Sequence, residues 1–361
     1  MINSSKTKLP PKLLLKIIVA GASFLIGTGL FVVFKYTLKL QKDATKEPWL
    51  IKKYGFENLK KAYPDWDDAS LFELLKETSD WPMIYEPFTG ISHAEKTGRF
   101  INYNFSGFRE SAEKNTWPPD FRKKTIFIFG GSTVLGAGVP DGKTIPSLVQ
   151  QKLKKPEISV YNFGRGFYFS TQEKILFLQL LERKYRPTLV IFIHGLNDFY
   201  FFDGNPEFTE KISNLFTGEN SYISLNTKTT KKLSEAQKVE QVVERLLENR
   251  KQTMAICKAY GIEYLEVIQP VPLYKYSSKL FIIPAPSKHD FGRHYLHKLG
   301  YKKINLMSEF NTDNKNLLNL SKLLAEETEV SYCDLVHYTE KTNELIAKKI
   351  QSHIEKYFDE L

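Results

Sequence analysis

Ser132 is the residue whose type and position most clearly allow chemistry. It stands in FGGSTVLGAG, residues 129–138, at the end of the apolar run TIFIFGG, residues 125–131. A serine hydroxyl is a weak nucleophile, so it needs a histidine base, an acid that orients that histidine, and hydrogen-bond donors for the oxyanion. A catalytic interpretation therefore requires these groups at the ends of other strands.

Three other uses of a glycine-rich turn do not fit this spacing. A phosphate-binding Walker A loop needs a lysine after its second glycine, but Ala137 follows Gly136. The glycines of this stretch do not have the G-x-G-x-x-G spacing of a dinucleotide-binding turn, and Ser132 lies in G-G-S-T rather than in a G-x-S-x-G elbow. A serine that merely caps a helix remains the alternative to a nucleophile.

Two later motifs offer partners for Ser132. CDLVHYT, residues 333–339, places Asp334 and His337 three residues apart, so that the carboxylate can orient the imidazole while the other ring nitrogen faces Ser132. HGLNDF, residues 194–199, places Asn197 after a predicted strand, where its side-chain N–H can reach an oxyanion. The alternatives are a simple turn at Asn197 and a surface histidine near a helix start. His194 fits a structural role better than a catalytic one.

The motifs together resemble the four blocks of the SGNH (GDSL-type) hydrolases, in that family's order. The blocks are FGGSTVLGAG, VYNFGRGFYFSTQE, GLND and DLVH, and the resemblance covers residues 125–358. The stretch YEPFTG…NFSGFRES also resembles the lead-in of membrane-anchored bacterial members. The resemblance implies that Ser132 is the nucleophile, that His337 is the base and then the acid, and that Asp334 orients His337. It also implies an oxyanion hole formed by Asn197 and by backbone N–H groups of Ser132 and the glycine block, where we expect Gly166.

The chain departs from the family pattern at two places. Gly131 stands where many members have aspartate. In the glycine block, the family's second glycine aligns with Phe167 or is displaced to Gly166. The donor there is a backbone N–H, so a residue other than glycine can serve, and the choice between the two stays open.

The elements that must position these residues alternate along the chain between strands and helices. This alternation predicts an α/β fold with a mostly parallel, doubly wound sheet, and the resemblance implies a three-layer α/β/α sandwich with a flavodoxin-like parallel sheet. Ser170 or Thr171 is expected to cap the first long helix, Ser234 to cap the second, and Gly261 to end it. Two stretches, 202–233 and 273–330, are expected to be insertions. The predicted strands are 125–131, 158–164, 187–195 and 262–270, and the predicted helices are 170–184, 234–261 and 339–358.

The N-terminus contains an uncharged run, IIVAGASFLIGTGLFVVF, residues 17–34. It is long enough to cross a bilayer and too long for a signal peptide that ends near Ala22, so we expect an uncleaved single-pass anchor. Four lysines precede the run and four follow it, so charge alone does not orient it. We expect the catalytic domain on the extracytoplasmic side. The expected organisation is a tail at 1–12, a transmembrane anchor at 13–38, a stalk and lead-in at 39–124, and a hydrolase-like domain at 125–361.

Composition excludes several classes of protein. The net charge of +10 comes from basic residues spread along all 361 positions, which disfavours a nucleic-acid partner and suits an anionic membrane surface.

Cys257 and Cys333 lack metal-ligand spacing and can pair only if the fold brings them together. The histidines of HDFGRHYLH, residues 289–297, have no carboxylate pair to complete a ligand set, so neither a metal nor a cofactor is expected. The aromatic residues at 168–169 and 199–202 are expected either to line the site or to pack.

The resemblance implies a serine ester hydrolase that forms an acyl-enzyme. The expected substrate is an acyl or acetyl ester on a membrane-proximal glycan or lipid. Two alternatives stay open: an O-acyltransferase that uses the same triad with a sugar hydroxyl in place of water, and a non-catalytic carbohydrate-binding or scaffold protein.

Overall fold

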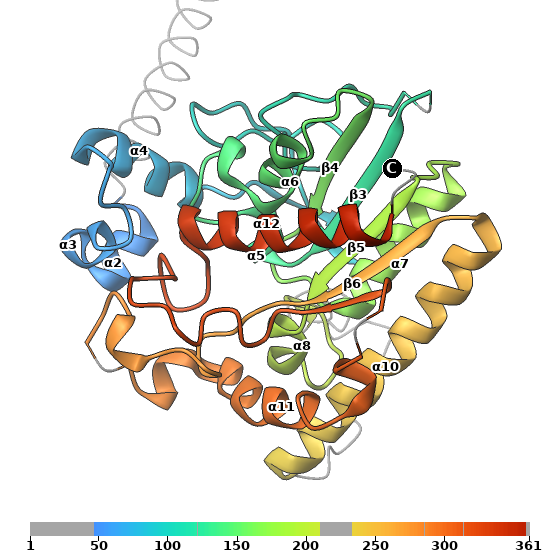
Figure 1. Cartoon of the computed structure of the whole chain (residues 1–361). Coiled ribbons are helices and arrows are strands. Elements are labelled where there is room, and N and C mark those ends of the chain that lie inside the picture. Colours follow the sequence, from blue (N-terminus) through green and yellow to red (C-terminus); the bar gives the residue numbers. More distant parts are fainter. Residues whose placement is uncertain (1–46, 121, 210–232, 285, 313, 359–361) are drawn as a thin grey trace, which may run out of the picture. The chain divides into compact units, whose positions relative to one another are not determined.

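The apolar runs predicted as strands form a five-stranded parallel sheet in the computed structural model, which describes residues 47–120, 122–209, 233–284, 286–312 and 314–358. The order across the sheet is β4–β3–β5–β6–β7, and every neighbouring pair is parallel (Figure 1). This is the order of flavodoxin-like sheets, whose switch point here lies between β3 and β5. The strands are β3 Lys124–Gly130, β4 Ile158–Gly164, β5 Leu189–His194, β6 Glu263–Ile268 and β7 Leu317–Asn319.

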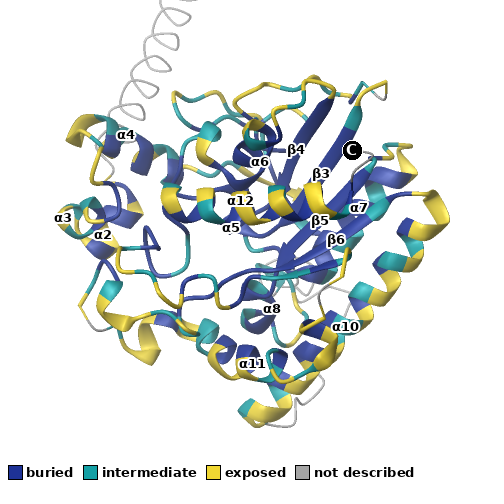
Figure 2. Cartoon of the chain, viewed as in Figure 1, coloured by how far each residue is buried: buried dark blue, intermediate teal, exposed yellow. Residues whose placement is uncertain are grey.

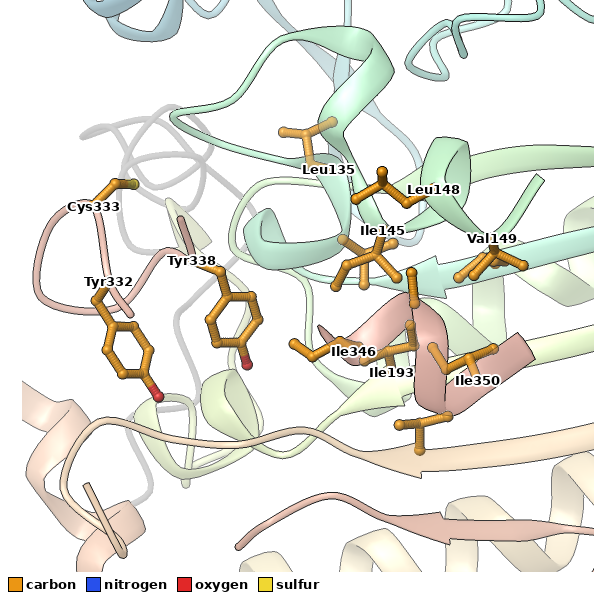
Figure 3. Close-up of a cluster of buried hydrophobic side chains, with 14 of the residues drawn as sticks. Leu135, Ile145, Leu148, Val149, Ile193, Tyr332, Cys333, Tyr338, Ile346 and Ile350 are labelled. Carbon is orange, nitrogen blue, oxygen red and sulfur yellow. The ribbon is translucent and has the colours of Figure 1, made fainter. Parts of the chain in front are cut away.

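Side chains of β3 alternate between two hydrophobic clusters, one on each face of the sheet. Ile126 and Ile128 of β3 belong to the cluster that contains apolar residues of α6 (Ile145–Leu153) and α12 (Glu340–Tyr357). Figure 3 shows the side chains of these two helices gathered around Ile193 of β5. Helices therefore cover this face of the sheet.

The other face of β3 carries phenylalanines. Phe127 and Phe129 belong to a second cluster, with apolar residues of α7 (Ser170–Glu182) and α10 (Glu235–Tyr260). β4 and β5 are buried throughout, and β3 and β6 are buried after their first residue, whereas α10 and α12 expose their outer sides (Figure 2). Burial on both faces explains why these strands read as continuous apolar runs in the sequence.

The predicted helix ends are confirmed for α10 and wrong for α7. Ser234 caps α10 in a reciprocal capping box, and Gly261 ends it in the left-handed conformation. The residue that precedes α7 is Phe169, which makes no side-chain cap. Ser170 instead donates its hydroxyl to Asp198 Oδ1 at 2.5 Å, because this helix end is buried against the loop after β5.

Residues 49–124 pack into the same compact unit as the sheet, which runs from Trp49 to Leu361. Their apolar side chains, among them Leu59, Leu71 and Leu74, are fully buried in the cluster of β3, α6 and α12. The structure therefore differs from the expected stalk and from a domain that begins at residue 125. The elements of this segment are α2 Trp49–Tyr54, α3 Phe56–Lys60, α4 Asp68–Ser79, β1 Met83–Glu86 and β2 Gly90–His93.

The stretch 273–330, expected as an insertion, contains the fifth strand. β7 has only three residues, too few to form a recognisable apolar run. The other elements in it are η2 Ser278–Leu280, η3 Lys288–Leu296, α11 His297–Ile304 and η4 Ser308–Phe310, and one further short helix, η1 Asp141–Lys143, lies earlier in the chain.

The two cysteines are buried and free, Cys257 in the cluster of α7 and α10 and Cys333 in that of α6 and α12. The expected membrane anchor, its charged flanks and most of the 202–233 stretch lie outside the described residues. In the part of the chain that the structure describes, we find no helix with the length and apolar character of a membrane span.

Candidate active site

Two short helices begin at the carboxyl ends of β3 and β5, the two strands on either side of the switch point. Ser132 is the first residue of α5 (Ser132–Leu135), and Asn197 lies in the first turn of α8 (Leu196–Tyr200). Open α/β sheets bind their ligands at this kind of crevice. The structure thus places the predicted serine and asparagine at neighbouring strand ends.

A continuous hydrogen-bond chain joins Ser132, His337 and Asp334. His337 Nε2 lies 2.8 Å from Ser132 Oγ, and His337 Nδ1 lies 2.6 Å from Asp334 Oδ2. Asp334 Oδ1 accepts the backbone N–H groups of Val336 at 2.7 Å and His337 at 2.8 Å. These contacts fix the orientation of the imidazole, so its Nε2 is placed to take the proton of the serine hydroxyl.

The Asp334 carboxylate keeps its charge although its side chain is only 5 % exposed. Burial by itself raises the pKa of Asp334, but the charge of His337 and the hydrogen bonds to His337 and Val336 lower the pKa below its usual value. An ionised Asp334 can stabilise an imidazolium at His337.

Three of the residues that line the cavity with the serine hydroxyl can supply an N–H donor: Ser132, Phe167 and Asn197. The backbone N–H groups of Ser132 and Phe167 have no hydrogen-bond acceptor among the described residues. Asn197 Nδ2 donates one hydrogen to the carbonyl of Tyr168 at 2.8 Å, which leaves its second amide hydrogen for a ligand. This donor set can bind an oxyanion that forms next to Ser132 Oγ.

The structure favours Phe167 over the expected Gly166 as the donor from the glycine block. The N–H of Gly166 is already bonded to His93 Nε2 at 3.3 Å, and Gly166 does not line the cavity. Burial, together with the charges of nearby arginines, lowers the pKa of His93 to about 3, so its imidazole is neutral and can accept this bond. Phe167 has a positive φ of 65°, a conformation that favours glycine and that side chains adopt only under constraint.

Gly131 is a glycine because Asn197 approaches its α-carbon. A Cβ at residue 131 would lie 2.5 Å from Asn197 Nδ2 and 3.0 Å from the carbonyl oxygen of Tyr168. Asn197 Nδ2 would have to move away from such a Cβ, and the Tyr168 carbonyl would have to shift by a few tenths of an ångström. Glycine at residue 131 therefore leaves room for this asparagine rotamer.

The buried side chain of Arg109 holds the turn that carries the serine. Its guanidinium donates to the carbonyls of Leu135 at 2.9 Å, Gly136 at 2.6 Å and Val139 at 2.6 Å, and its Nε pairs with Asp141 at 2.9 Å. These bonds satisfy carbonyls at the end of α5. Arg109 lies in the lead-in stretch NFSGFRES, where the sequence did not identify it as a functional residue.

Arg109→Ala is expected to lower the free energy of unfolding by about 3–5 kcal/mol, the range found when one partner of a buried ion pair is removed. The substitution leaves the Asp141 side chain, only 14 % exposed, without its cation, and it leaves three carbonyls without a donor. Urea denaturation measures this loss. Arg122→Ala is the matched control, since Arg122 forms an exposed pair with Asp120 and its loss should change stability little.

A cavity of about 300 Å³ opens above Ser132, His337 and Asn197. Its walls are mostly apolar, as is usual for small-ligand sites. Four of its lining residues come from the lead-in segment, which the sequence did not connect with the site: Trp49, Ser79, Trp81 and Met83. Of the two uses left open for the aromatic residues at 168–169 and 199–202, packing applies to Tyr168, Phe169, Phe199 and Phe201, which are buried.

The histidines of residues 289–297 do not gather around a common point. His294 lines the cavity, and burial, together with the charge of His337, lowers its pKa to about 3, so it is uncharged. His297 is buried and accepts the backbone N–H of Leu273 at 3.1 Å. Within the described ranges, no three His, Cys, Asp or Glu side chains come together as metal ligands.

A buried charge network lies at the end of β5, just before the helix that carries Asn197. His194, at the end of β5, contacts Glu173 Oε2 at 3.0 Å and Glu266 Oε1 at 2.9 Å, and Arg250 pairs with the other oxygen of Glu266. Burial lowers the pKa of His194, but the two carboxylates outweigh burial and raise it well above its usual value. The charged imidazole therefore acts as a structural cation at this strand end.

Comparisons with known proteins give matches among solved structures alone. No family model matches the chain, and no curated protein does. A member of the lipolytic protein G-D-S-L family from Veillonella parvula is 12 % identical, with a TM-score of 0.39, over 66 % of this chain and 100 % of that one. The psychrotrophic esterase EstA from Pseudoalteromonas sp. is 16 % identical, with a TM-score of 0.37, over 66 % of this chain and 100 % of that one.

A carbohydrate acetylesterase family member from Sinorhizobium meliloti is 13 % identical, with a TM-score of 0.33, over 64 % of this chain and 98 % of that one. Identities and scores of this size assign no role to any residue here. GDSL-type lipolytic proteins and esterases are thus among the solved structures to which this chain is similar.

Proposed function

We propose that this chain is a serine ester hydrolase of the SGNH type, with Ser132 as nucleophile. The observation that carries the proposal is the hydrogen-bond chain from Ser132 Oγ through His337 to Asp334, in a cavity that also presents three N–H donors. If Ser132 served only to cap a helix, it would not need a histidine nitrogen 2.8 Å from its hydroxyl or the buried carboxylate of Asp334 behind that histidine.

The chemistry follows from the placement of these groups. Ser132 Oγ attacks the ester carbonyl carbon while His337 Nε2 takes its proton, and the N–H groups of Ser132, Phe167 and Asn197 stabilise the oxyanion. His337 returns the proton to the leaving alcohol, which leaves an acyl group on Ser132. A water molecule that loses a proton to His337 then attacks the acyl carbon. The bond between the acyl carbon and Ser132 Oγ breaks as His337 returns that proton to Oγ, and the products are a carboxylic acid and the free serine.

A fluorophosphonate probe tests the proposal directly, since it phosphonylates activated serines. The full chain is expected to be labelled, with the label on the peptide that contains Ser132, and Ser132→Ala is expected to lose the label. Ser79→Ala is the matched control, because Ser79 lines the same cavity but donates its hydroxyl to the Leu75 carbonyl and has no histidine base. Absence of labelling in a folded wild-type chain would contradict the proposal and favour a non-catalytic binding protein.

The proposed substrate is a small acyl ester, such as an acetyl group on a glycan or a lipid near a membrane. A cavity of about 300 Å³ with walls of Trp49, Trp81 and Phe167 supports a short acyl group beside an apolar or sugar-ring face. Hydrolysis rates for nitrophenyl esters of increasing chain length test this, with the acetyl ester expected to be faster than long-chain esters.

Anchoring at a membrane by residues 17–34, with the catalytic unit on the extracytoplasmic side, is part of the proposal. Its support is the apolar run itself and the expected location of acylated envelope glycans. Protease added outside spheroplasts is expected to digest the unit 49–361, and full protection would reverse the proposed orientation.

Asn197→Ala is expected to lower kcat by about 10²–10³-fold, the effect of losing one oxyanion donor. KM should change much less, because the lost bond strengthens only in the transition state. Steady-state kinetics on a short acyl ester separates the two parameters. An unchanged kcat would remove Asn197 from the oxyanion hole.

Gly131→Ala is expected to lower kcat through the same asparagine, since the added methyl group must displace Asn197. The effect should therefore not add to that of Asn197→Ala, and the double variant should be about as active as Asn197→Ala alone. Additive losses would show that residue 131 acts on the site by another route.

A further inference from the structure

The β1 strand exposes apolar side chains on both of its faces. Met83, Ile84 and Tyr85 are consecutive and are 40 %, 50 % and 64 % exposed. Successive side chains of a strand point to opposite faces, so exposure of all three means that neither face of β1 is covered. Its partner β2 is mostly buried, so β1 is the strand of this two-stranded sheet that faces the solvent.

Phe88 extends this apolar surface at the bend between the two strands, where it is 82 % exposed. The bend is nonetheless firmly attached to the body of the domain. Glu86 forms an ion pair with the buried Arg165, and Gln172 donates to the carbonyl of Thr89 at 2.6 Å. The exposed apolar groups thus sit on a fixed scaffold. We name Met83, Ile84, Tyr85 and Phe88 the apolar hairpin.

The apolar hairpin continues into the wall of the candidate active site. Met83 belongs to both the hairpin and the cavity lining, and so connects the two. Trp49, on the same cavity wall, is 45 % exposed, and the exposed Lys53 places its ammonium 5.8 Å from the Trp49 ring. An apolar surface with tryptophan, tyrosine and lysine at its margin is typical of proteins that bind at a lipid–water interface.

The length of chain before this surface favours a membrane as its occupant. The uncharged run of the predicted anchor ends at residue 34, and Trp49 follows 15 positions later. Fully extended, such a segment reaches at most about 54 Å, at roughly 3.3–3.6 Å per residue. The four lysines in this segment can neutralise anionic head groups. The cavity wall that contains Trp49 is therefore tethered within reach of the bilayer surface.

We propose that the apolar hairpin docks on the surface of a lipid bilayer that contains anionic phospholipid, with Ile84, Tyr85 and Phe88 inserted at the boundary between head groups and acyl chains. Docking removes these side chains from water, and it turns the cavity mouth at Met83 and Trp49 toward the membrane. The proposal depends on the predicted span as the tether and does not depend on ester hydrolysis.

The test uses the full chain in vesicles of phosphatidylethanolamine and phosphatidylglycerol. A single cysteine, as Tyr85→Cys or, in a second variant, Phe88→Cys, carries an environment-sensitive fluorophore, since the native cysteines are buried and free. Leu306→Cys is the matched control, because Leu306 is 87 % exposed and does not line the cavity. The expected result is a blue shift and quenching by doxyl-labelled lipid at residues 85 and 88, with neither at residue 306.

Three fluorescence results would overturn the proposal: water-like, unquenched fluorescence at residues 85 and 88 in the membrane-bound chain, equal quenching at residue 306, or energy transfer between labelled copies without lipid quenching. The last result identifies a second copy of the chain as the occupant. Failure of the full chain to associate with vesicles also overturns the proposal. Quenching needs no turnover, so its failure is distinguishable from failure of the proposed hydrolase activity.

Discussion

Replacing Ser132 with alanine is expected to lower kcat by about 10⁴-fold or more, which amounts to loss of ester hydrolysis. The variant keeps the cavity and the three N–H donors but has no oxygen to form the acyl-enzyme. The measurement is steady-state hydrolysis of a short acyl ester by the full chain. Turnover at a rate near that of the wild type would rule out the proposed mechanism.

The fold should survive this substitution, so lost activity can be assigned to chemistry. The Ser132 hydroxyl bonds only to His337 among the described residues, and α5 begins through backbone contacts around Gly131. The urea midpoint of Ser132→Ala should therefore match that of the wild type. A large fall in the midpoint would show that the hydroxyl has a structural role that the hydrogen bonds do not reveal.

Asp334→Asn is expected to lower kcat by about 10⁴-fold while leaving the backbone in place. The carboxylate accepts the Nδ1–H of His337 at 2.6 Å and so keeps Nε2 free to act as a base. A carboxamide can present its NH₂ group to His337 instead, which favours the tautomer with hydrogen on Nε2 and blocks proton transfer from Ser132. Fluorophosphonate labelling should slow in parallel with kcat, and unchanged labelling would contradict the assigned role.

Asp334→Asn is also expected to change how the free energy of unfolding depends on pH. The folded-state pKa of Asp334 is lowered, so its contribution to stability is complete above the pKa of a free aspartate, about 3.9, and is lost as the pH falls through the folded-state value. The difference in unfolding free energy between wild type and Asp334→Asn should be constant near neutral pH and shrink below about pH 4. A difference in unfolding free energy that grows as the pH falls would contradict the lowered pKa of Asp334.

Local patterns were sufficient to predict most of the core elements. Four apolar runs bounded by glycines and turns became β3, β4, β5 and β6, because strands buried on both faces need apolar side chains at most positions. The caps of α10 follow from Ser234 and Gly261, whose effects act over one turn of helix. Ser170 does not form the expected cap, because its hydroxyl donates instead to the buried carboxylate of Asp198, which lies far along the chain.

The lead-in segment was not predictable in this way. Short helical patterns are visible in it, and α4 has buried leucines at helical spacing, but α2, α3 and the four-residue strands of the hairpin are too short for a periodic pattern to place them. Their placement depends on apolar contacts with elements more than a hundred residues away, such as those of Leu59 and Leu71 in the cluster of α12. For the same reason, Arg109 and Trp81 could not be connected with the site before the fold was known.

The sequence by itself determined which residue types stand at the strand ends: a serine after β3, an asparagine after β5, and an aspartate and a histidine before α12. Residue type and spacing are local properties, and the elements that fix them are stabilised by short-range contacts. Tertiary structure alone decided that His337 meets Ser132 across 205 positions, that Asn197 fits over Gly131, and that residues 49–83 wall the cavity. Those outcomes depend on packing between distant elements, and no pattern along the chain encodes the distances that such packing sets.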